Sequence, residues 1–398
     1  MNPFELYLPT RYIFGPGVEN RTGEEVKRAG GSRVLLHYSG GSVRRSGLLD
    51  RVKTSLDEAG VAYVELSGVK PNPDMELAYE GIEQVRAEGL DFVLALGGGS
   101  VIDSAKAIAL GAVYDGDAWD YYTGKARPAE ALPIGTVPTL PAAGSEGSDS
   151  SVMNLTAEDG TVYKRSTGGE CIVPKFALEN PELTHTLPPE QTAAGVADIF
   201  THTCERYFTQ TRDVYLTDLF CESIMKTLIK YGPIVMEDPE NKAAREQIMW
   251  ASTMAHNNIT GVGRDQDWAS HMIEHELSAL YDVTHGAGLA AVNPAWMRYV
   301  YKEDTARFVR FATEVFGVAN DPWHPEVTAL EGIKALKRFY RSLGLPVTLA
   351  ELGGKEEDIP KLVSMIGIGE HGLGSFKVLH EEDVEAIYAL MKEDDELD

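Results

Sequence analysis

Four side chains have the types and spacing of a site for a catalytic divalent metal ion: Asp198, His202, His271 and His285. Asp198 and His202 are four residues apart, a spacing that places both on one face of a helix. His271 and His275 have the same spacing, and three of the chain's 10 histidines fall within 15 residues. A carboxylate combined with imidazoles suits Zn²⁺ or Fe²⁺ better than Mg²⁺ or Ca²⁺.

Spacing alone leaves open which histidines bind the ion. His271 with His275 is an alternative ligand pair, as in other helical metal sites. His285 precedes Gly286 at an expected helix start, which would hold the ring rigidly and allow close approach. If Asp198 and His202 both bind, one of the three later histidines does not, because a catalytic site keeps an open position. Any one of these histidines, taken singly, is more often a packed or surface residue.

A glycine-rich turn at residues 97–99 is the second candidate site. It stands where an expected strand ends and an expected helix begins. Glycines let the backbone approach a phosphate closely, and the free N–H groups at a helix start favour an anion. A tight strand-to-helix turn is the plainer interpretation, because the motif is not G-x-G-x-x-G. Ser100 and Asp103 have the spacing of a capping box, so we also expect them to cap this helix.

Another turn, Ser39-Gly40-Gly41-Ser42, follows the first expected strand and leads into Arg44 and Arg45. In doubly wound folds ligands collect at the carboxyl ends of strands. The acidic residue that usually binds a ribose 2′-hydroxyl is absent from this loop until Asp50. Small hydroxyls and two arginines would instead admit a 2′-phosphate, which favours NADP over NAD. A solvated helix start is the alternative interpretation of the two arginines.

The elements that must position these residues change in kind near Pro181. Before it, expected strands at 34–38, 62–66, 92–96 and 133–137 alternate with expected helices at about 47–59, 74–88 and 101–110. This alternation predicts a largely parallel sheet. After it, the 3.6-residue period predicts helices at about 191–208, 214–231, 241–259, 268–281, 286–300, 305–316, 326–343 and 382–392. We predict an α/β domain over 1–180 and an all-helical domain over 181–398.

Composition and charge limit the kinds of partner and the cellular compartment that we expect for this protein. The 398 residues carry a formal net charge of -25, which argues against nucleic acid or an anionic membrane surface. Three cysteines without regular spacing predict no disulfide framework. The N-terminus lacks the pattern of a signal peptide, and no apolar run approaches about 18 residues, so we expect a cytoplasmic protein without a membrane span. The acidic end, 392–398, is expected to be a frayed tail.

Five stretches together resemble the iron-containing (group III) alcohol dehydrogenases, especially their NADP-linked butanol dehydrogenase and aldehyde reductase branch. They occur in the family's order, span most of the chain, and are more specific together than any one alone. The stretches are Tyr38–Ser42, Gly97–Lys106, Pro138–Glu146, Gly195–His202 and Gln266–Leu277. The chain departs from close relatives at Ser39, where glycine is frequent, and at Ser148, where some have asparagine.

The resemblance implies a dinucleotide-binding α/β domain and a helical domain, with the active site in the cleft between them. It implies that Asp198, His202, His271 and His285 bind Fe²⁺ or Zn²⁺, and that His275 faces the substrate. It assigns cofactor contacts to Gly40, Gly41, Ser42, Gly97, Gly98, Gly99, Ser100, Asp103, Thr139, Leu140, Lys164 and Leu183. The implied reaction is reversible hydride transfer between NADP(H), or NAD(H), and a primary alcohol or aldehyde such as butanol or butyraldehyde. The implied assembly is a homodimer or larger.

Three other functions fit parts of the pattern. A lyase like dehydroquinate synthase shares the architecture, NAD and a metal, but needs lysines and arginines near the metal, and the stretches around Asp198 and His271 are poor in them. A glycerol dehydrogenase-like enzyme would oxidise a polyol, usually with NAD. A nucleotide-binding protein with a structural metal would need a closed coordination sphere, which four ligands allow.

Overall fold

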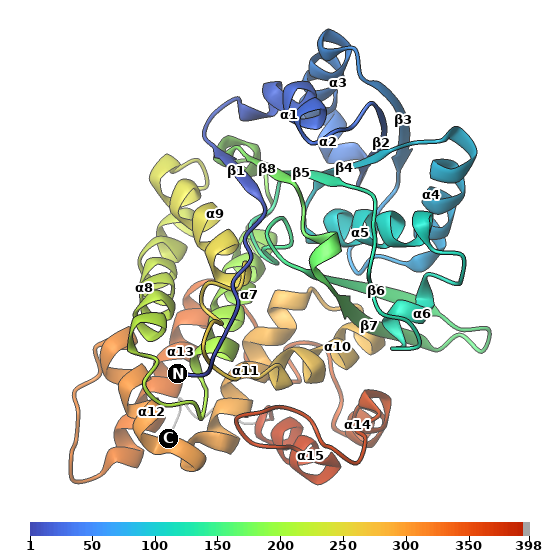
Figure 1. Ribbon diagram of the computed structural model, residues 1–398. Coiled ribbons are helices and arrows are strands. Elements are labelled where there is room, and N and C mark those ends of the chain that lie inside the picture. Colours follow the sequence, from blue (N-terminus) through green and yellow to red (C-terminus); the bar gives the residue numbers. More distant parts are fainter. Residues whose placement is uncertain (393–398) are drawn as a thin grey trace. The chain divides into compact units, whose positions relative to one another are not determined.

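The computed structural model describes residues 1–392; residues 393–398, in the predicted frayed tail, lie outside the described residues. Contacts group the chain into a sheet unit, Tyr7–Leu187, and a helical unit, Met1–Leu6 with Pro188–Asp398 (Figure 1). The backbone N–H of Asn2 donates to the carbonyl of Gly263 at 2.8 Å, so the first residues pack with the helical unit. No helix between residues 1 and 392 is long and apolar enough to cross a membrane.

Six parallel strands form the centre of the sheet unit, in the order β1-β8-β5-β4-β2-β3. The strands are β1 (Arg11–Phe14), β2 (Arg33–Tyr38), β3 (Ala62–Ser67), β4 (Phe92–Gly97), β5 (Ile134–Pro138) and β8 (Phe176–Glu179). The predicted parallel sheet and its four predicted strands, β2 to β5, are confirmed. The sequence reading missed β1 and β8, which have only four residues each.

Helices cover both faces of this sheet (Figure 1). Successive side chains of a strand point to opposite faces. Leu35 of β2 packs in a cluster with residues of α4 (Met75–Glu88) and α5 (Gly99–Val113). Its neighbours Val34 and Leu36 pack in another cluster with residues of α1 (Thr22–Arg28) and α3 (Leu48–Ala59). Burial on both faces explains why the central strands are continuous apolar runs rather than alternating patterns.

An antiparallel hairpin, which the sequence reading also missed, follows β5. It consists of β6 (Ser150–Thr156) and β7 (Val162–Gly168). The remaining elements of the sheet unit are short: α2 (Gly41–Arg45), α6 (Trp119–Tyr122), η1 (Val18–Arg21), η2 (Glu170–Ile172) and η3 (Pro181–Thr184).

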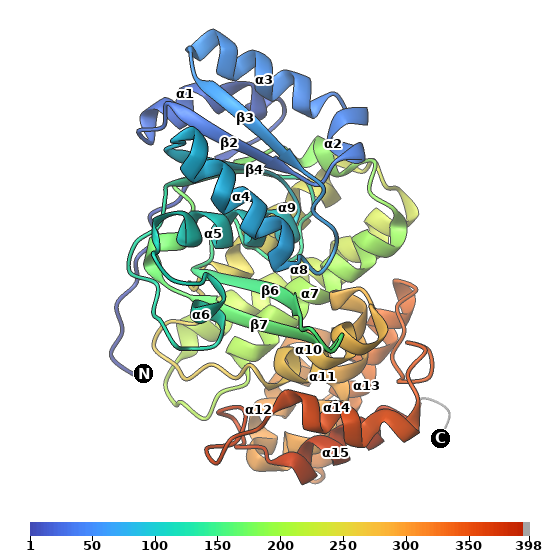
Figure 2. The same ribbon diagram turned by 90° about the vertical axis from the view of Figure 1, so that its right-hand side faces the viewer.

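The helical unit confirms the eight predicted helices. They are α7 (Pro189–Tyr207), α8 (Tyr215–Glu237), α9 (Lys242–His256), α10 (Ala269–Tyr281), α11 (His285–Val300), α12 (Thr305–Arg310) continued by the π-helical turn η5 (Phe311–Val315), α13 (Pro325–Ser342) and α15 (Glu381–Leu390). The short α14 (Ile359–Ile366) was not predicted, and η4 (Tyr301–Asp304) and η6 (Glu356–Asp358) are single turns. Helix α7 contacts α8, α9, α10 and α11, and α10 lies beside α11 (Figure 2).

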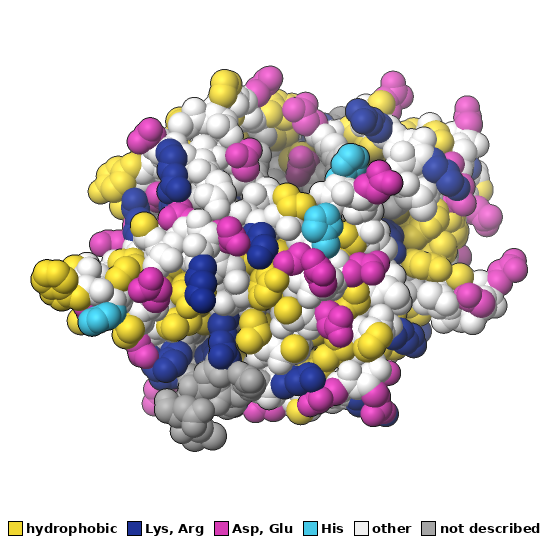
Figure 3. Space-filling view, turned by 90° about the horizontal axis from the view of Figure 1, so that it is seen from below, with side chains coloured by type: hydrophobic (Ala, Val, Ile, Leu, Met, Phe, Trp, Pro, Cys, Tyr) yellow, Lys and Arg dark blue, Asp and Glu magenta, His cyan; other side chains and the backbone are white. Residues whose placement is uncertain are grey.

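Charges of both signs are interspersed on the face of the molecule seen in Figure 3. Among the residues that the structure describes on that face, lysines and arginines alternate with acidic side chains and form no continuous basic surface of the kind that binds nucleic acid.

Candidate metal centre and cofactor site

Three helices bring the four candidate ligands together. Asp198 and His202 lie one turn apart on α7, His271 lies in the first turn of α10, and His285 is the first residue of α11. The expected helix start at His285 is confirmed. Helix α11 can approach α7 closely because residue 286 is glycine: a Cβ there would lie 1.9 Å from the carbonyl oxygen of Ala194. A larger residue would therefore push His285 away from Asp198.

Asp198 Oδ1 is the centre of the group. His202 Nδ1 lies 3.4 Å from it, His271 Nε2 3.7 Å and His285 Nε2 3.9 Å. Ligands bound to one tetrahedral ion at ordinary metal–ligand distances are about 3.4 Å apart. The three distances from Asp198 Oδ1 are therefore close to the spacing between ligands in a coordination shell.

Three of these atoms also lack an ordinary partner. Asp198 Oδ1, His202 Nδ1 and His271 Nε2 are buried and have no hydrogen bond among the described residues. A buried polar group without a partner costs about 1–3 kcal/mol, so a concentration of three needs a reason. A cation coordinated by all three removes this cost. The residues present therefore fit a metal ion.

Two buried glutamates bond the other ring nitrogen of two candidate ligands, His271 and His285. Glu205 Oε2 bonds His271 Nδ1, while its Oε1 accepts the backbone N–H of His271 at 3.0 Å. Glu274 Oε2 bonds His285 Nδ1, and Glu274 Oε1 accepts from Ser278 Oγ. Carboxylates of this kind fix the tautomer and orientation of a ligating imidazole. The sequence reading missed both; their signal was a glutamate three residues after His202 and another three after His271.

Burial and neighbouring charges shift the pKa values of His202 and His271, two of the three histidines facing Asp198, in opposite directions. Burial lowers the pKa of His202 well below its usual value, and neighbouring His256 lowers it further. Burial acts in the same direction on His271, but the carboxylates of Glu205 and Asp198 outweigh it and raise its pKa to about 9. Because a metal binds the neutral ring, a metal ion bound at this candidate site would displace a proton from His271.

His275 lies one turn beyond His271 on α10 and is also buried. Its ring centroid is 5.7 Å from that of His285. Its ligand atom groups with those of Glu274 and His285, whereas Asp198, His202 and His271 form a separate group. The structure thus places His275 beside the ligand candidates, next to His285.

In the sheet unit, both glycine-rich turns lie at one place. Strand β2 has β3 on one side and β4 on the other, so the direction in which the sheet grows reverses at β2. The turn at 97–99 follows β4, and the loop from Ser39 follows β2. Open parallel sheets bind ligands at the carboxyl ends of strands where the order reverses. The structure therefore places the two candidate turns where a dinucleotide is expected.

The turn after β4 has no room for side chains. A Cβ would lie 2.4 Å from Val101 Cγ2 at Gly97, and 2.7 Å from Ala143 Cβ at Gly99. Helix α5 begins at Gly99, so its free N–H groups are at the turn. The predicted capping role of Ser100 and Asp103 is wrong, because Ser100 is already inside the helix and no described side chain caps it.

Asp103 instead bonds within the sheet unit. Its Oδ1 accepts from Ser145 Oγ at 2.6 Å, and its Oδ2 accepts the backbone N–H of Val152 at 3.0 Å. Both acceptors connect α5 to the segment that follows β5.

The loop after β2 requires glycine at one position, since Gly40 has φ of +128°. Gly41 and Ser42 begin the short helix α2, which carries Arg44. Arg44 donates to the Tyr38 hydroxyl at 2.5 Å and lies 3.8 Å from Glu65. The sequence reading found no acid in this loop; Glu65 comes from the neighbouring strand β3.

The remaining cofactor candidates follow other strands. Thr139 donates its backbone N–H to the carbonyl of Gly97 at 3.1 Å, and Leu140 lies against Gly98. Both therefore adjoin the glycine turn. Lys164, on β7, donates to Asn72 Oδ1 at 3.3 Å, and Leu183, in η3, packs against the α1–α3 side of the sheet.

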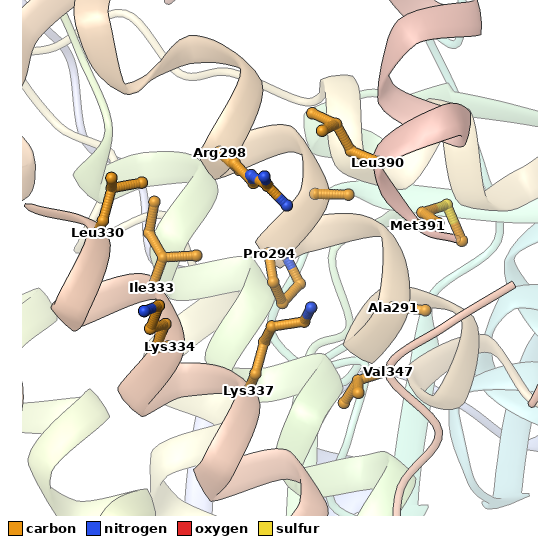
Figure 4. A pocket seen from close by; sticks show the side chains of 11 residues that line it. Ala291, Pro294, Arg298, Leu330, Ile333, Lys334, Lys337, Val347, Leu390 and Met391 are labelled. Atoms are coloured by element: carbon orange, nitrogen blue, oxygen red, sulfur yellow. The ribbon is translucent and has the colours of Figure 1, made fainter. Parts of the chain in front are cut away.

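A separate pocket of about 280 Å³ lies in the helical unit, with Arg298 and Lys337 projecting into it (Figure 4). None of the described residues lining it is a candidate ligand or cofactor residue.

Comparison with known proteins shows the family to which this chain belongs. Residues 9–181 match the family described as iron-containing alcohol dehydrogenase, and residues 192–391 match its C-terminal region. NADH-dependent butanol dehydrogenase A of Clostridium acetobutylicum is 41% identical over 98% of this chain and 99% of its own. NADPH-dependent aldehyde reductase YqhD of Escherichia coli is 37% identical over 96% of each chain.

Solved structures give the same result. The crystal structure of NADH-dependent butanol dehydrogenase A from Thermotoga maritima is 40% identical, covers 99% of both chains and superposes with a TM-score of 0.94. This chain therefore belongs to the iron-containing alcohol dehydrogenase family, in its butanol dehydrogenase and aldehyde reductase branch.

Proposed function

We propose that this enzyme transfers hydride reversibly between a nicotinamide dinucleotide and a primary alcohol or aldehyde such as butanol or butyraldehyde. The observation that carries the proposal is the buried group around Asp198, whose three partnerless atoms fit a metal ion. The chain is an alcohol dehydrogenase by family, and its relatives at about 40% identity carry the names of butanol dehydrogenases. Neither the polyol-oxidising nor the lyase alternative is favoured by these relatives.

Asp198, His202, His271 and His285 would hold the ion, with Fe²⁺ or Zn²⁺ suited to this ligand set. A divalent metal there supplies a Lewis acid for the oxygen of an alcohol or aldehyde, and a nicotinamide supplies or accepts the hydride. Glu205 keeps the ring of His271 in one tautomer. Elemental analysis of anaerobically prepared protein tests the site: one ion of either metal per chain is expected, and none would contradict it.

The activity has a direct assay. Metal-loaded protein is expected to oxidise NADPH or NADH in the presence of butyraldehyde, followed by absorbance. Absence of turnover with both cofactors would favour a protein whose metal is structural.

His275 is proposed to contact the substrate and to move a proton at its oxygen, because it is buried one turn beyond His271 and its ring centroid lies 5.7 Å from that of His285. His275→Ala is expected to keep its metal and to lower kcat about 100-fold, the usual scale of general acid–base catalysis. His271→Ala is the matched variant on the same helix and should lose both metal and activity. Metal loss in His275→Ala would make His275 a ligand and contradict the assignment.

We propose NADP as the preferred cofactor, because Arg44 and Arg45 stand beside the loop expected to meet the adenosine ribose. Similar relatives carry both NADH-dependent and NADPH-dependent names, so the preference needs a measurement. The ratio of kcat/KM for NADPH to that for NADH should exceed one. Arg45→Ala should lower this ratio about tenfold by removing one charge-assisted contact while leaving the NADH value unchanged. Equal losses with both cofactors would contradict the proposal.

A further inference from the structure

Lys106 is a buried lysine to which the proposed reaction assigns no role. It lies on α5, two turns after the glycine turn, and its side chain has no exposed surface. Burying an ammonium is costly unless several acceptors surround it. Most other buried side chains of α5 are alanine, valine, isoleucine or leucine, so a buried lysine among them needs a physical reason.

The acceptors all come from one segment. Lys106 Nζ lies 2.7 Å from the carbonyl oxygen of Ser145, 2.9 Å from that of Ser148 and 2.8 Å from that of Ser150. The hydroxyls of Ser145 and Ser148 are 2.9 and 3.2 Å away. Five oxygens from residues 145–150 thus converge on one ammonium, and three of them are carbonyls that no serine substitution can remove.

Asp103 completes the arrangement from the same helix. Ser145 Oγ donates its only proton to Asp103 Oδ1 at 2.6 Å, so it accepts from Lys106. The two charged side chains of α5 therefore hold opposite sides of the same hydroxyl. Segment 145–150 is tied to α5 by a cation and an anion together.

The other end of this segment adjoins the glycine turn. The backbone N–H of Thr139 donates to the carbonyl of Gly97. The side chain of Leu140 lies against Gly98, and that of Ala143 lies 2.7 Å from where a Cβ on Gly99 would be. The chain from residue 139 to 150 is therefore held at two places: the turn itself, and Lys106 on the helix that follows the turn.

We propose that Lys106 is a positioning residue for the dinucleotide: its ammonium fixes segment 139–150 against the turn at 97–99 and so shapes the surface that binds the cofactor. The inference rests on the proposed function, which places a nicotinamide dinucleotide at this turn. Lys106 acts through Thr139 and Leu140 and does not itself contact the cofactor.

Lys106→Met tests the proposal, because methionine fills a similar volume and donates no hydrogen bond. We expect the Kd of NADPH, measured by quenching of tryptophan fluorescence, to rise about tenfold, the scale of losing hydrogen bonds to a charged group. The KM for the cofactor should rise in parallel, while kcat at saturating cofactor and metal content stay at the wild-type values.

Val52→Ala is the matched control for lost stability. Val52 is fully buried on α3, against the other face of the sheet, and belongs to the cluster that does not include α5. This variant should lower Tm and leave the Kd of NADPH unchanged. If Lys106→Met also lowers Tm but binds NADPH like the wild type, Lys106 supports only the fold and the proposal is overturned.

The pH dependence supplies an independent readout. Burial lowers the pKa of Lys106 to about 8, against the opposing effects of Asp103 on the same helix and of Asp149 and Glu146 in the facing segment. The wild-type Kd of NADPH should therefore rise as the pH is raised through about 8, whereas that of Lys106→Met should not change over the same range. Parallel profiles for the two proteins would overturn the assignment.

Ser145→Ala decides the matter if Lys106→Met does not fold. It removes the hydroxyl shared by Lys106 and Asp103 and keeps the three carbonyl contacts. A smaller rise in the Kd of NADPH, about threefold, is expected, and an unchanged Kd would overturn the proposal. If wild-type protein binds neither NADPH nor NADH, the proposed function fails instead, and this distinguishes the two failures.

Discussion

At the scale of residues, the candidate metal centre depends on groups that never touch the ion. Glu205 uses both carboxylate oxygens on His271, one on the ring and one on the backbone N–H. It leaves Nε2 of that ring facing Asp198. Removing the carboxylate charge also removes one of these two acceptors, because a glutamine amide has a single oxygen. The orientation of the His271 ring therefore depends on both hydrogen bonds between His271 and Glu205.

Glu205→Gln is therefore expected to lower metal affinity about 10–100-fold with the fold retained. Competition with a chelator measures the affinity. Glu222→Gln is the matched control, because Glu222 is another buried carboxylate of the helical unit but bonds Tyr207 and Arg310. The control should lose stability and keep its metal. Equal metal loss in both variants would mean that Glu205 matters only through general stability.

At the scale of elements, His37 joins β2 to β3 and to α5. Its Nδ1 lies 3.1 Å from the carbonyl oxygen of Leu66, so Nδ1 carries the proton. Its Nε2 lies 2.9 Å from Ser104 Oγ and accepts that hydroxyl. A second proton on the ring would go to Nε2, and the hydrogen bond that Nε2 accepts from Ser104 would then be lost. Burial, the dominant effect, lowers the pKa of His37 to about 4.

This histidine makes the sheet unit sensitive to acid. Above pH 6.5 the ring is neutral in both the folded and the unfolded chain, and no penalty arises. Between pH 6.5 and about 4 only the unfolded chain binds the proton, so the free energy of unfolding falls by about 3 kcal/mol. His37→Gln should be less stable than the wild type at pH 7 and should lose less stability over this interval. Urea unfolding at a series of pH values measures both, and identical slopes would contradict the prediction.

At the scale of the whole molecule, each unit carries one of the two candidate sites. The four ligand candidates belong to α7, α10 and α11 of the helical unit. The turns at 39–42 and 97–99 belong to the sheet unit. A ligand stabilises the folded form of whatever binds it. The proposed reaction needs both units, and the predicted homodimer or larger assembly stays a prediction.

Hydrogen exchange can assign each ligand to its unit. Adding Zn²⁺ to metal-free protein should slow amide exchange in α7, α10 and α11, and adding NADPH should slow it at residues 97–101. At a hundredfold excess over Kd the slowing reaches about 100-fold for amides that exchange by unfolding of that unit. Protection by Zn²⁺ confined to the sheet unit would contradict the proposed ligands.

The sequence by itself determined those features that depend only on the spacing of residues close together in the chain. Two residues four apart on a helix share a face, so Asp198 and His202 could be paired from their positions alone. Apolar runs alternating with helical periods predicted the parallel sheet, and a glycine run after a strand marked the candidate anion-binding turn. Most strands and helices could be predicted because each one repeats a short-range pattern of apolar residues.

Tertiary structure decided everything that depends on contacts between distant segments. Glu205 and His271 are 66 residues apart, and no spacing rule predicts that a buried carboxylate will meet that ring. Glu65 lies on β3 whereas Arg44 lies on α2, and the oxygens around Lys106 come from residues about 40 positions later. Burial decided these cases, because a charged group removed from water must find its partner wherever the fold brings one within reach.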